Sequence, residues 1–163
     1  MPSSTQQSLF ILDSAEEMQR HIQQLLEQGK HKVAIFSRTL NPLLFNHIAI
    51  VDAVSAIARS SPNAEVSILV QQPQVVAETN HLLLDLYRRL PSKIQCRKVI
   101  IEPQDDSEFM LVDDDKLWLQ HKVGIYTGFA NYDDRPQVKQ YREKLSTLWL
   151  HSEEDARLRS IIL

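Results

Sequence analysis

The stretch DSEFMLVDDDKLW, residues 106 to 118, decides which fold this sequence encodes. It predicts a buried β-strand that runs into a tight acidic turn, because the apolar run 109–112 is followed at once by three aspartates. We expect the hairpin turn at Asp114 and Asp115, with a second strand after it. Two carboxylates, Asp106 and Glu108, stand where this strand begins, and they raise the question of what the strand carries.

The elements on either side of this strand divide the chain into two unlike halves. Up to Pro91, apolar residues at helical spacing alternate with short apolar runs, which favours a parallel sheet with helices on its faces. The elements expected in this half are a helix from Asp13, capped with Glu16, to Gly29, a strand at 32–36, a helix after Pro42, a strand at 65–70 and a helix from Pro73 to Leu90. Beyond Pro91, four extended runs predict antiparallel strands, followed by a helix near Pro136. The predicted fold class is therefore α/β, with a mixed parallel and antiparallel sheet between helical layers.

The composition limits the class of protein. With 163 residues, 43% hydrophobic and 24% charged, we expect one globular domain over residues 1–163, with residues 1–8 flexible. The net charge of -3 makes a nucleic-acid partner an unfavourable expectation. Cys96 is the single cysteine, and the chain has neither a signal peptide nor an apolar run that could span a membrane, so a cytoplasmic protein is expected.

The acidic residues around the strand raise the alternative of a metal site. The calcium-loop pattern with its glycine is missing, and no two of the six histidines are spaced as metal ligands on a helix or strand. We therefore expect no metal and no cofactor, and a solvated turn at each end of the strand is the simpler interpretation.

The strand and the segments after it resemble the phospholipase D superfamily, whose signature is H-x-K-x-x-x-x-D running into a hydrophobic hairpin. Asp113 falls on the aspartate, Asp106 on the nucleophilic histidine and Glu108 on the phosphate-binding lysine. GFAN, residues 128–131, resembles the G-S-x-N segment, although Gly128 lies further from Asp113 than is usual, which implies a longer hairpin. The resemblance implies one half of a phospholipase D fold.

The two carboxylates in this frame make the family's chemistry unfavourable. Each would repel a phosphodiester by about 4 kcal/mol at about 4 Å and an effective dielectric of about 20, where the family uses a cation. None of the six histidines is followed two residues later by lysine, so the pair has not moved elsewhere. We expect a catalytically degenerate half without catalytic residues.

By the same resemblance, four residues would line whatever pocket remains: Ser37, Arg38, Asn131 and Arg135. The alternative is a structural role, in which the two arginines pair with acidic neighbours and the asparagine caps a turn. Trp118 and Leu119 would lie on the longer hairpin, which would meet a partner or fold back into the vacated pocket.

Active members of the superfamily place two halves face to face, so a single half implies a homodimer. Degenerate domains of this kind are similar to those appended to bacterial acetyltransferase-like proteins, which implies an accessory or regulatory role and a protein partner of that type. The expected function is a non-catalytic binding or interaction module of unknown ligand in a bacterial cytoplasm. The alternative is a phosphodiesterase or nuclease with a rearranged active site.

Overall fold

An eight-stranded sheet forms the middle of the molecule in the computed structural model, which describes residues 7–159. The strands are β1 (Leu9–Leu12), β2 (Lys32–Ser37), β3 (Glu65–Val70), β4 (Ile94–Val99), β5 (Glu108–Val112), β6 (Lys116–Lys122), β7 (Ile125–Asn131) and β8 (Ser152–Glu153). Their order in the sheet is β1-β7-β6-β5-β2-β3-β4-β8. The pairs β2–β3 and β3–β4 are parallel, and the other pairs are antiparallel.

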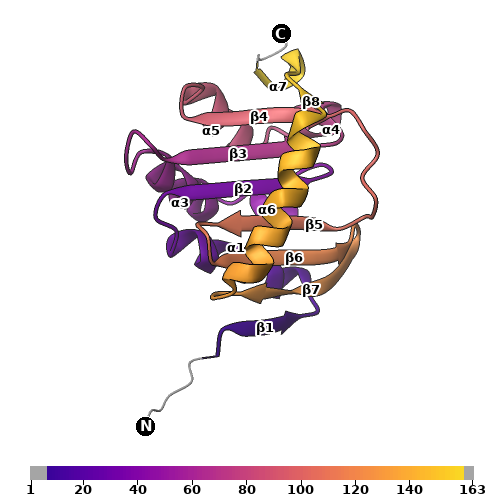
Figure 1. Ribbon diagram of the computed structural model, residues 1–163. Coiled ribbons are helices and arrows are strands. Elements are labelled where there is room, and N and C mark those ends of the chain that lie inside the picture. The colour runs from indigo at the N-terminus through magenta and orange to yellow at the C-terminus, as the bar shows by residue number, and fades with distance from the viewer. Residues whose placement is uncertain (1–6, 160–163) are drawn as a thin grey trace.

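Helices cover both faces of this sheet (Figure 1). They are α1 (Ala15–Glu27), α2 (Pro42–Phe45), α3 (Ile48–Ala58), α4 (Pro73–Glu78), α5 (Leu82–Arg89), α6 (Arg135–Leu150) and α7 (Ala156–Arg159). The larger core lies on the face of α1, α3 and α5, where β2 contributes Val33 and Ile35. The smaller core lies on the other face under α6, where β2 contributes Ala34 and Phe36. The predicted class, a mixed sheet between helical layers, is confirmed.

Local sequence explains where the helices begin and break. The cap of α1 is Ser14, whose hydroxyl accepts a hydrogen bond from the Glu17 N–H at 3.1 Å, one residue later than the predicted cap. The single helices expected after Pro42 and Pro73 are each broken in two. The second break contains Asn80, whose φ of 50° lies in the left-handed region, and the Asn46 side chain of the first break accepts from the Leu82 N–H at 2.9 Å. The two breaks are thus held together.

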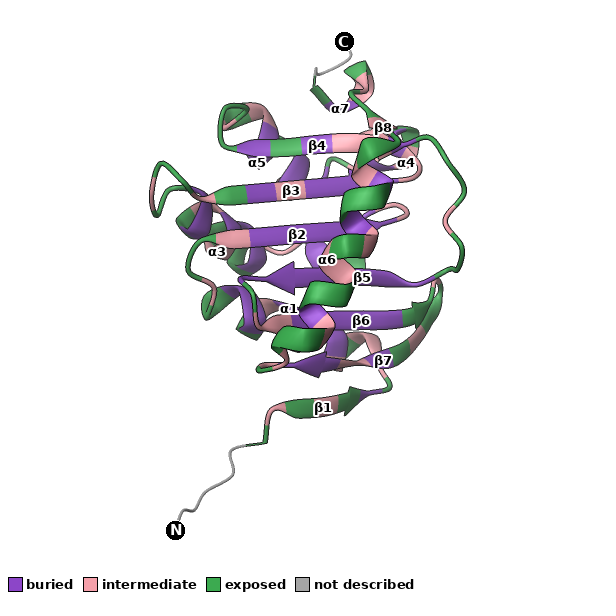
Figure 2. Ribbon diagram, viewed as in Figure 1, coloured by how far each residue is buried: buried purple, intermediate pink, exposed green. Residues whose placement is uncertain are grey.

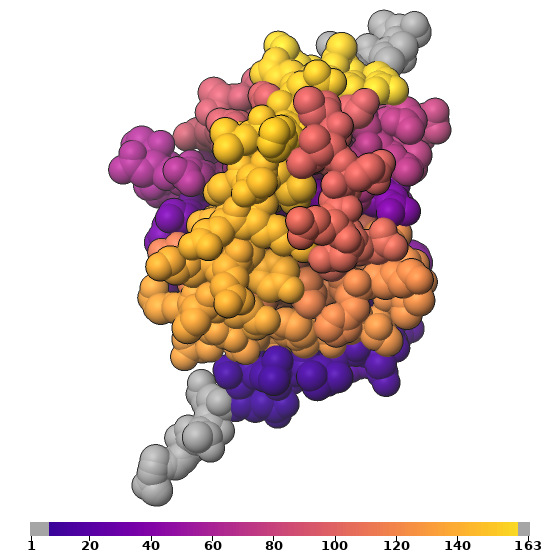
Figure 3. All heavy atoms as spheres, turned by 45° about the vertical axis from the view of Figure 1, so that its right-hand side comes forward, coloured from indigo at the N-terminus to yellow at the C-terminus, as the bar shows by residue number. Residues whose placement is uncertain are grey.

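The sheet has two edges of different character along the strand direction. We call the edge where β2, β3 and β4 end and β5 begins the motif edge, and the other the opposite edge. The segment that joins β4 to β5 runs along the motif edge, and Figure 3 shows it, in salmon, beside α6. In the described part of the chain, no helix combines the length and apolar character needed to cross a membrane.

Two short strands were not predicted, and one expectation falls outside the structure. β1 pairs antiparallel with β7 at one side of the sheet, and the two-residue β8 pairs with β4 at the other. Such short edge pairings leave almost no periodic signal in a sequence. The expected flexibility of residues 1–8 lies largely outside the described residues, which begin at residue 7.

The hairpin of β5 and β6 is tight, and the expectation of a projecting, longer hairpin is wrong. Its register pairs Glu108 with Gln120 and Met110 with Trp118. Trp118 is fully buried and packs edge-to-face on Phe45 with ring centroids 5.7 Å apart. Leu119, on the other face, is also buried. Alternation along a regular strand therefore places both side chains in the two cores, because both faces of the sheet are covered.

Candidate functional site

A buried carboxylate occupies the motif edge, at the position that the family resemblance assigns to the phosphate-binding lysine. Glu108 is 3% exposed, and its Oε1 accepts a hydrogen bond from the Ser37 hydroxyl at 2.8 Å. Its Oε2 accepts from the Arg38 backbone N–H at 3.0 Å. The Ser37 hydroxyl oxygen in turn accepts from the Leu40 N–H at 3.0 Å. We call these contacts of Glu108, Ser37, Arg38 and Leu40 the Glu108 clasp.

The clasp holds the chain where it leaves β2. Leu40 adopts a φ of 51°, and its carbonyl accepts from Nε2 of the buried His81 at 2.8 Å. The His81 Nδ1 accepts from the Leu83 N–H at 3.2 Å, which leaves the ring proton on Nε2. Burial lowers the pKa of His81, so the ring is neutral and both of its nitrogens serve the backbone.

The electrostatics of the clasp differ from those of a phosphate site. Burial raises the pKa of the Glu108 carboxyl, although the hydrogen bonds from Arg38 and Ser37 favour its charged form. The Arg38 guanidinium lies 3.4 Å from the Asp106 carboxylate, at a place where both side chains are partly exposed. The one cation at the clasp is therefore already paired with the residue at the position of the nucleophilic histidine.

Gln120 completes this row of polar side chains, and the sequence interpretation missed it. It is 2% exposed and lies opposite Glu108 in the β5–β6 pairing, on the same face of the sheet. Its Nε2 donates to the carbonyls of Lys122 and Ile125, both at 3.1 Å, while its Oε1 has no partner among the described residues. Counting equal steps outward from the turn at Asp114 would have found it, because a tight hairpin pairs residues symmetrically.

The four residues expected to line one pocket are not brought together. Ser37 and Arg38 belong to the clasp at the motif edge. Asn131 is the last residue of β7, at the opposite edge, where its side chain contacts Asp134 at 3.3 Å and the Asp133 N–H at 3.1 Å. Arg135 begins α6 beside it and is exposed. The cause is the tight hairpin: the return strand is β6, so the GFAN segment falls on the next strand and ends at the wrong edge.

The histidine nearest to these residues along the hairpin, His121, does not complete a catalytic pair. It follows Gln120 on β6, so its side chain leaves the sheet on the face opposite to Glu108. There its ring lies 6.2 Å from that of Phe129. Among residues 7–159, no three histidine, cysteine or acidic side chains gather in a way that could hold a metal ion.

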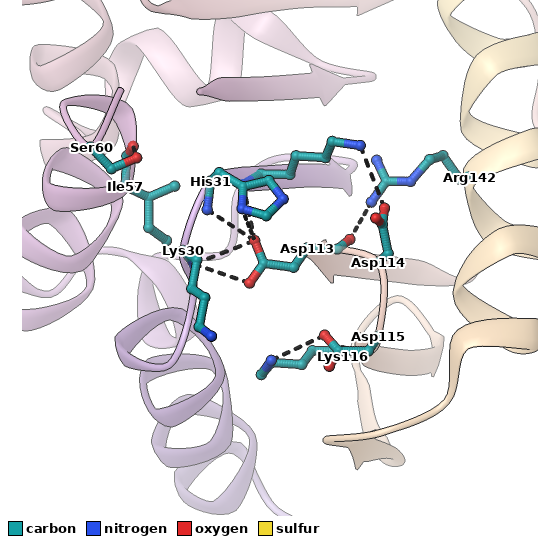
Figure 4. A network of polar contacts seen from close by, with 10 residues as sticks. Lys30, His31, Ile57, Ser60, Asp113, Asp114, Asp115, Lys116 and Arg142 are labelled. Atoms are coloured by element: carbon teal, nitrogen blue, oxygen red, sulfur yellow. Dashed lines mark hydrogen bonds and ion pairs between the residues drawn. The ribbon is translucent and has the colours of Figure 1, made fainter. Parts of the chain in front are cut away.

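Asp113, at the position of the family's aspartate, has a structural role at the opposite edge (Figure 4). Its carboxylate accepts from the backbone N–H groups of Lys30, His31 and Lys32 at 3.0–3.1 Å. Its carbonyl accepts from the Arg142 guanidinium, which ties the turn to α6. The φ of Asp113 is 55°, so the residue both makes the turn and binds the start of β2.

The pH dependence of stability is expected to report these contacts. Burial alone would raise the pKa of the Asp113 carboxyl, but the three backbone donors together hold it below its ordinary value. A carboxyl with a lowered folded pKa contributes stability that is complete above its unfolded pKa of about 3.9 and is lost as the pH falls through the folded value. Asp113→Asn should therefore cost about 1–3 kcal/mol at pH 7 and progressively less below about pH 4.

Urea unfolding of the wild type and Asp113→Asn across this range measures the difference. Asp114→Asn is the matched control, because that side chain is 50% exposed and its ion pair with Lys32 is long, at 3.5 Å. A difference between wild type and Asp113→Asn that stays constant from neutral pH into acid would show that the charge of Asp113 does not hold the turn.

Comparisons with known proteins place this geometry in a fold family. The model of a family described as "Domain of unknown function (DUF7931)" matches residues 14–161. No protein of curated function matches the sequence.

Solved structures share the fold at low sequence identity. TrmBL2, an archaeal chromatin protein, has a TM-score of 0.69 and 11% identity, and the match covers 94% of this chain and 56% of that chain. Nuc from Salmonella typhimurium, a phospholipase D family member, has a TM-score of 0.66 and 11% identity, with coverage of 91% and 97%. NucT from Helicobacter pylori has a TM-score of 0.60 and 14% identity, with coverage of 91% and 98%. The chain thus has a phospholipase D-like fold and spans little more than half of TrmBL2.

Proposed function

This chain belongs to the DUF7931 family, a domain of unknown function, and we propose that it is a non-catalytic phospholipase D-like module that acts by binding a partner. Its role in this proposal is accessory or regulatory, in a bacterial cytoplasm. TrmBL2 is described as binding DNA in a novel mode, but the net charge of -3 supplies no general attraction for phosphates here.

The observation that carries the proposal is the state of Glu108. Phosphoryl transfer depends on cations and donors aimed at the non-bridging oxygens. At this position the chain holds a buried carboxylate whose two oxygens are bonded to Ser37 and Arg38. The hydroxyl and the N–H that would otherwise face a ligand are consumed by the protein itself. The clasp therefore stabilises the loop after β2 and leaves no donor group for an anion between these strands.

A second copy of the chain is the partner that the motif edge supports best. Four exposed large hydrophobic residues lie around this edge, at the start of α2, after β4 and at the start of β7: Leu43 (61% exposed), Ile100 (55%), Ile101 (38%) and Ile125 (49%). Apolar side chains gathered on one side of a monomer are typical of surfaces that meet a protein. A partner similar to an acetyltransferase-like domain would use the same surface.

Assays of phosphodiester hydrolysis test the non-catalytic part of the proposal. The purified protein should not hydrolyse bis(4-nitrophenyl) phosphate above the rate of Asp106→Ala, because no described cation or nucleophile faces the position of a phosphate at the clasp. Turnover in the wild type that disappears in Asp106→Ala would establish the alternative, a phosphodiesterase with a rearranged site.

Light scattering tests the second copy. At micromolar concentration the wild type should have roughly twice the chain mass of 18.8 kDa. Ile100→Asp should shift the mass towards the monomer, because it places a charge in the apolar surface of the motif edge. Ile11→Asp is the matched control, since Ile11 is 75% exposed but lies on β1, away from this surface. A monomeric wild type, or equal effects of both variants, would exclude a homodimer through the motif edge.

A further inference from the structure

A groove lies at the opposite edge of the sheet, on the face that α6 crosses. The helix runs diagonally and leaves the first residues of β3 and β4 uncovered (Figure 1). Figure 2 shows exposed segments there, and Glu65 and Gln95 are among them. The groove between α6 and these strands has a volume of about 620 Å³. Small-molecule sites commonly occupy about 300–1,000 Å³, so the size suits a ligand.

Three cationic side chains from three different elements line the groove: Lys32, Lys93 and Arg142. Glu65 is the one acidic residue among the described residues that line it, and it is paired with Lys32 across β2 and β3. The Arg142 guanidinium donates to a neutral carbonyl, that of Asp113, so this contact does not cancel its charge. Lys93 is exposed and has no ion pair within the described part of the chain. The lining therefore carries an excess of positive charge.

The remaining walls are apolar on the helix side and polar on the floor. Leu145, Trp149 and Leu150 of α6 form the apolar side, while Ser67 and Gln95 of the sheet supply a hydroxyl and an amide. The Arg97 guanidinium lies 5.6 Å from the centroid of the Trp149 ring, which holds the indole in place. A flat apolar wall beside several cations favours a ligand with an anionic head and a flat apolar body.

We propose that this groove binds a small organic anion of about mononucleotide size, with a phosphate or carboxylate head on a flat apolar body. The proposal deepens the proposed binding role and rests on it, since it names a ligand class for a module that does not hydrolyse one. The anionic head contacts Lys93, Lys32 and Arg142, and the body lies along Trp149. The groove is at the opposite edge, so the Glu108 clasp and the apolar surface of the motif edge take no part.

Calorimetric titration with adenosine 5′-monophosphate, adenosine and inorganic phosphate tests the two halves of the ligand separately. The wild type should bind the monophosphate about tenfold or more tightly than either fragment, which corresponds to about 1.4 kcal/mol. Ser146→Glu, which places a carboxylate in the groove lining, should weaken that binding by about tenfold or more.

Thr147→Glu is the matched control for this charge. Both residues are exposed, and both hydroxyls donate to a carbonyl of the preceding turn, Ser146 to Arg142 and Thr147 to Glu143, but Thr147 does not line the groove. Thr147→Glu should leave the affinity within about twofold of the wild type. Similar far-ultraviolet circular dichroism and melting of both variants would show that the fold is intact.

Three results would overturn the groove as an anion site: no binding of any probe at millimolar concentration, adenosine binding as tightly as its monophosphate, or equal effects of Ser146→Glu and Thr147→Glu. These failures are distinct from failure of the proposed function. If they occur while hydrolysis stays absent and the dimer persists, the ligand is removed and the interaction module stands; if hydrolysis appears, the non-catalytic role itself is removed.

Discussion

Glu108→Lys is expected to destabilise the protein by about 3–5 kcal/mol, a large part of the stability of an ordinary domain. The substitution places the residue type of the family's phosphate-binding position in this chain. It removes the acceptor for the Ser37 hydroxyl and the Arg38 N–H, and it buries an ammonium at a position that is 3% exposed. Two unpaired donors beside a buried cation are a worse arrangement than the carboxylate that they replace.

Urea unfolding at neutral pH measures this effect, and Asp106→Lys is the matched control. It reverses the same charge two residues earlier, at a side chain that is 56% exposed and pairs with Arg38 at 3.4 Å. Exposed ion pairs of this kind contribute at most about 1 kcal/mol, so the control should unfold close to the wild type. Wild-type stability of Glu108→Lys would show that the clasp is dispensable and that this position still accepts a cation.

Trp118→Ala is expected to destabilise the protein by about 3–5 kcal/mol, the usual loss when a large buried aromatic side chain is deleted. Trp118 is among the largest fully buried side chains, and its contact with Phe45 joins β6 to α2. The sequence alone had placed this residue on a projecting hairpin, where its loss would weaken a dimer instead of the fold. Unfolding and light scattering therefore separate the two views.

Trp118→Phe refines the test, because the indole Nε1 has no hydrogen-bond partner among the described residues. Phenylalanine keeps an aromatic ring against Phe45 and removes the unpaired N–H, so its cost should be no more than about half that of alanine. If Trp118→Ala instead kept wild-type stability and became monomeric, the buried position of the side chain would be contradicted.

The order of strands and helices was largely predictable from the sequence. The runs at 32–36 and 65–70 became β2 and β3 with no more than one residue of difference. Such runs are readable because alternation and helical spacing record which side chains meet the core. The two helix breaks were not readable in this way, since apolar spacing continues across them. The break at Asn80 depends on its backbone conformation and on its proximity to the first break, which the Asn46–Leu82 hydrogen bond maintains.

The candidate site was predicted only in part, for a reason visible at Asn131. Its segment matched the family's motif by residue type, yet the tight turn puts Gln120 opposite Glu108 and sends Asn131 to the opposite edge. A difference of one strand in the assignment moves a residue across the whole width of the sheet. Residue types within a strand are local information, whereas the strand that faces a given position depends on the length of the turn.

By itself, the sequence determined the alternation of strands and helices, the acidic turn after Val112 and the absence of histidine and lysine from the motif positions. These features are local, because they depend on residue type and on spacing within one element. The tertiary structure alone decided that Glu108 bonds to Ser37 and Arg38, which precede it by 71 and 70 residues, and that α6 leaves a cationic groove beside β3 and β4. Those features depend on which strands lie side by side, and pairing between distant segments has no local period in the chain.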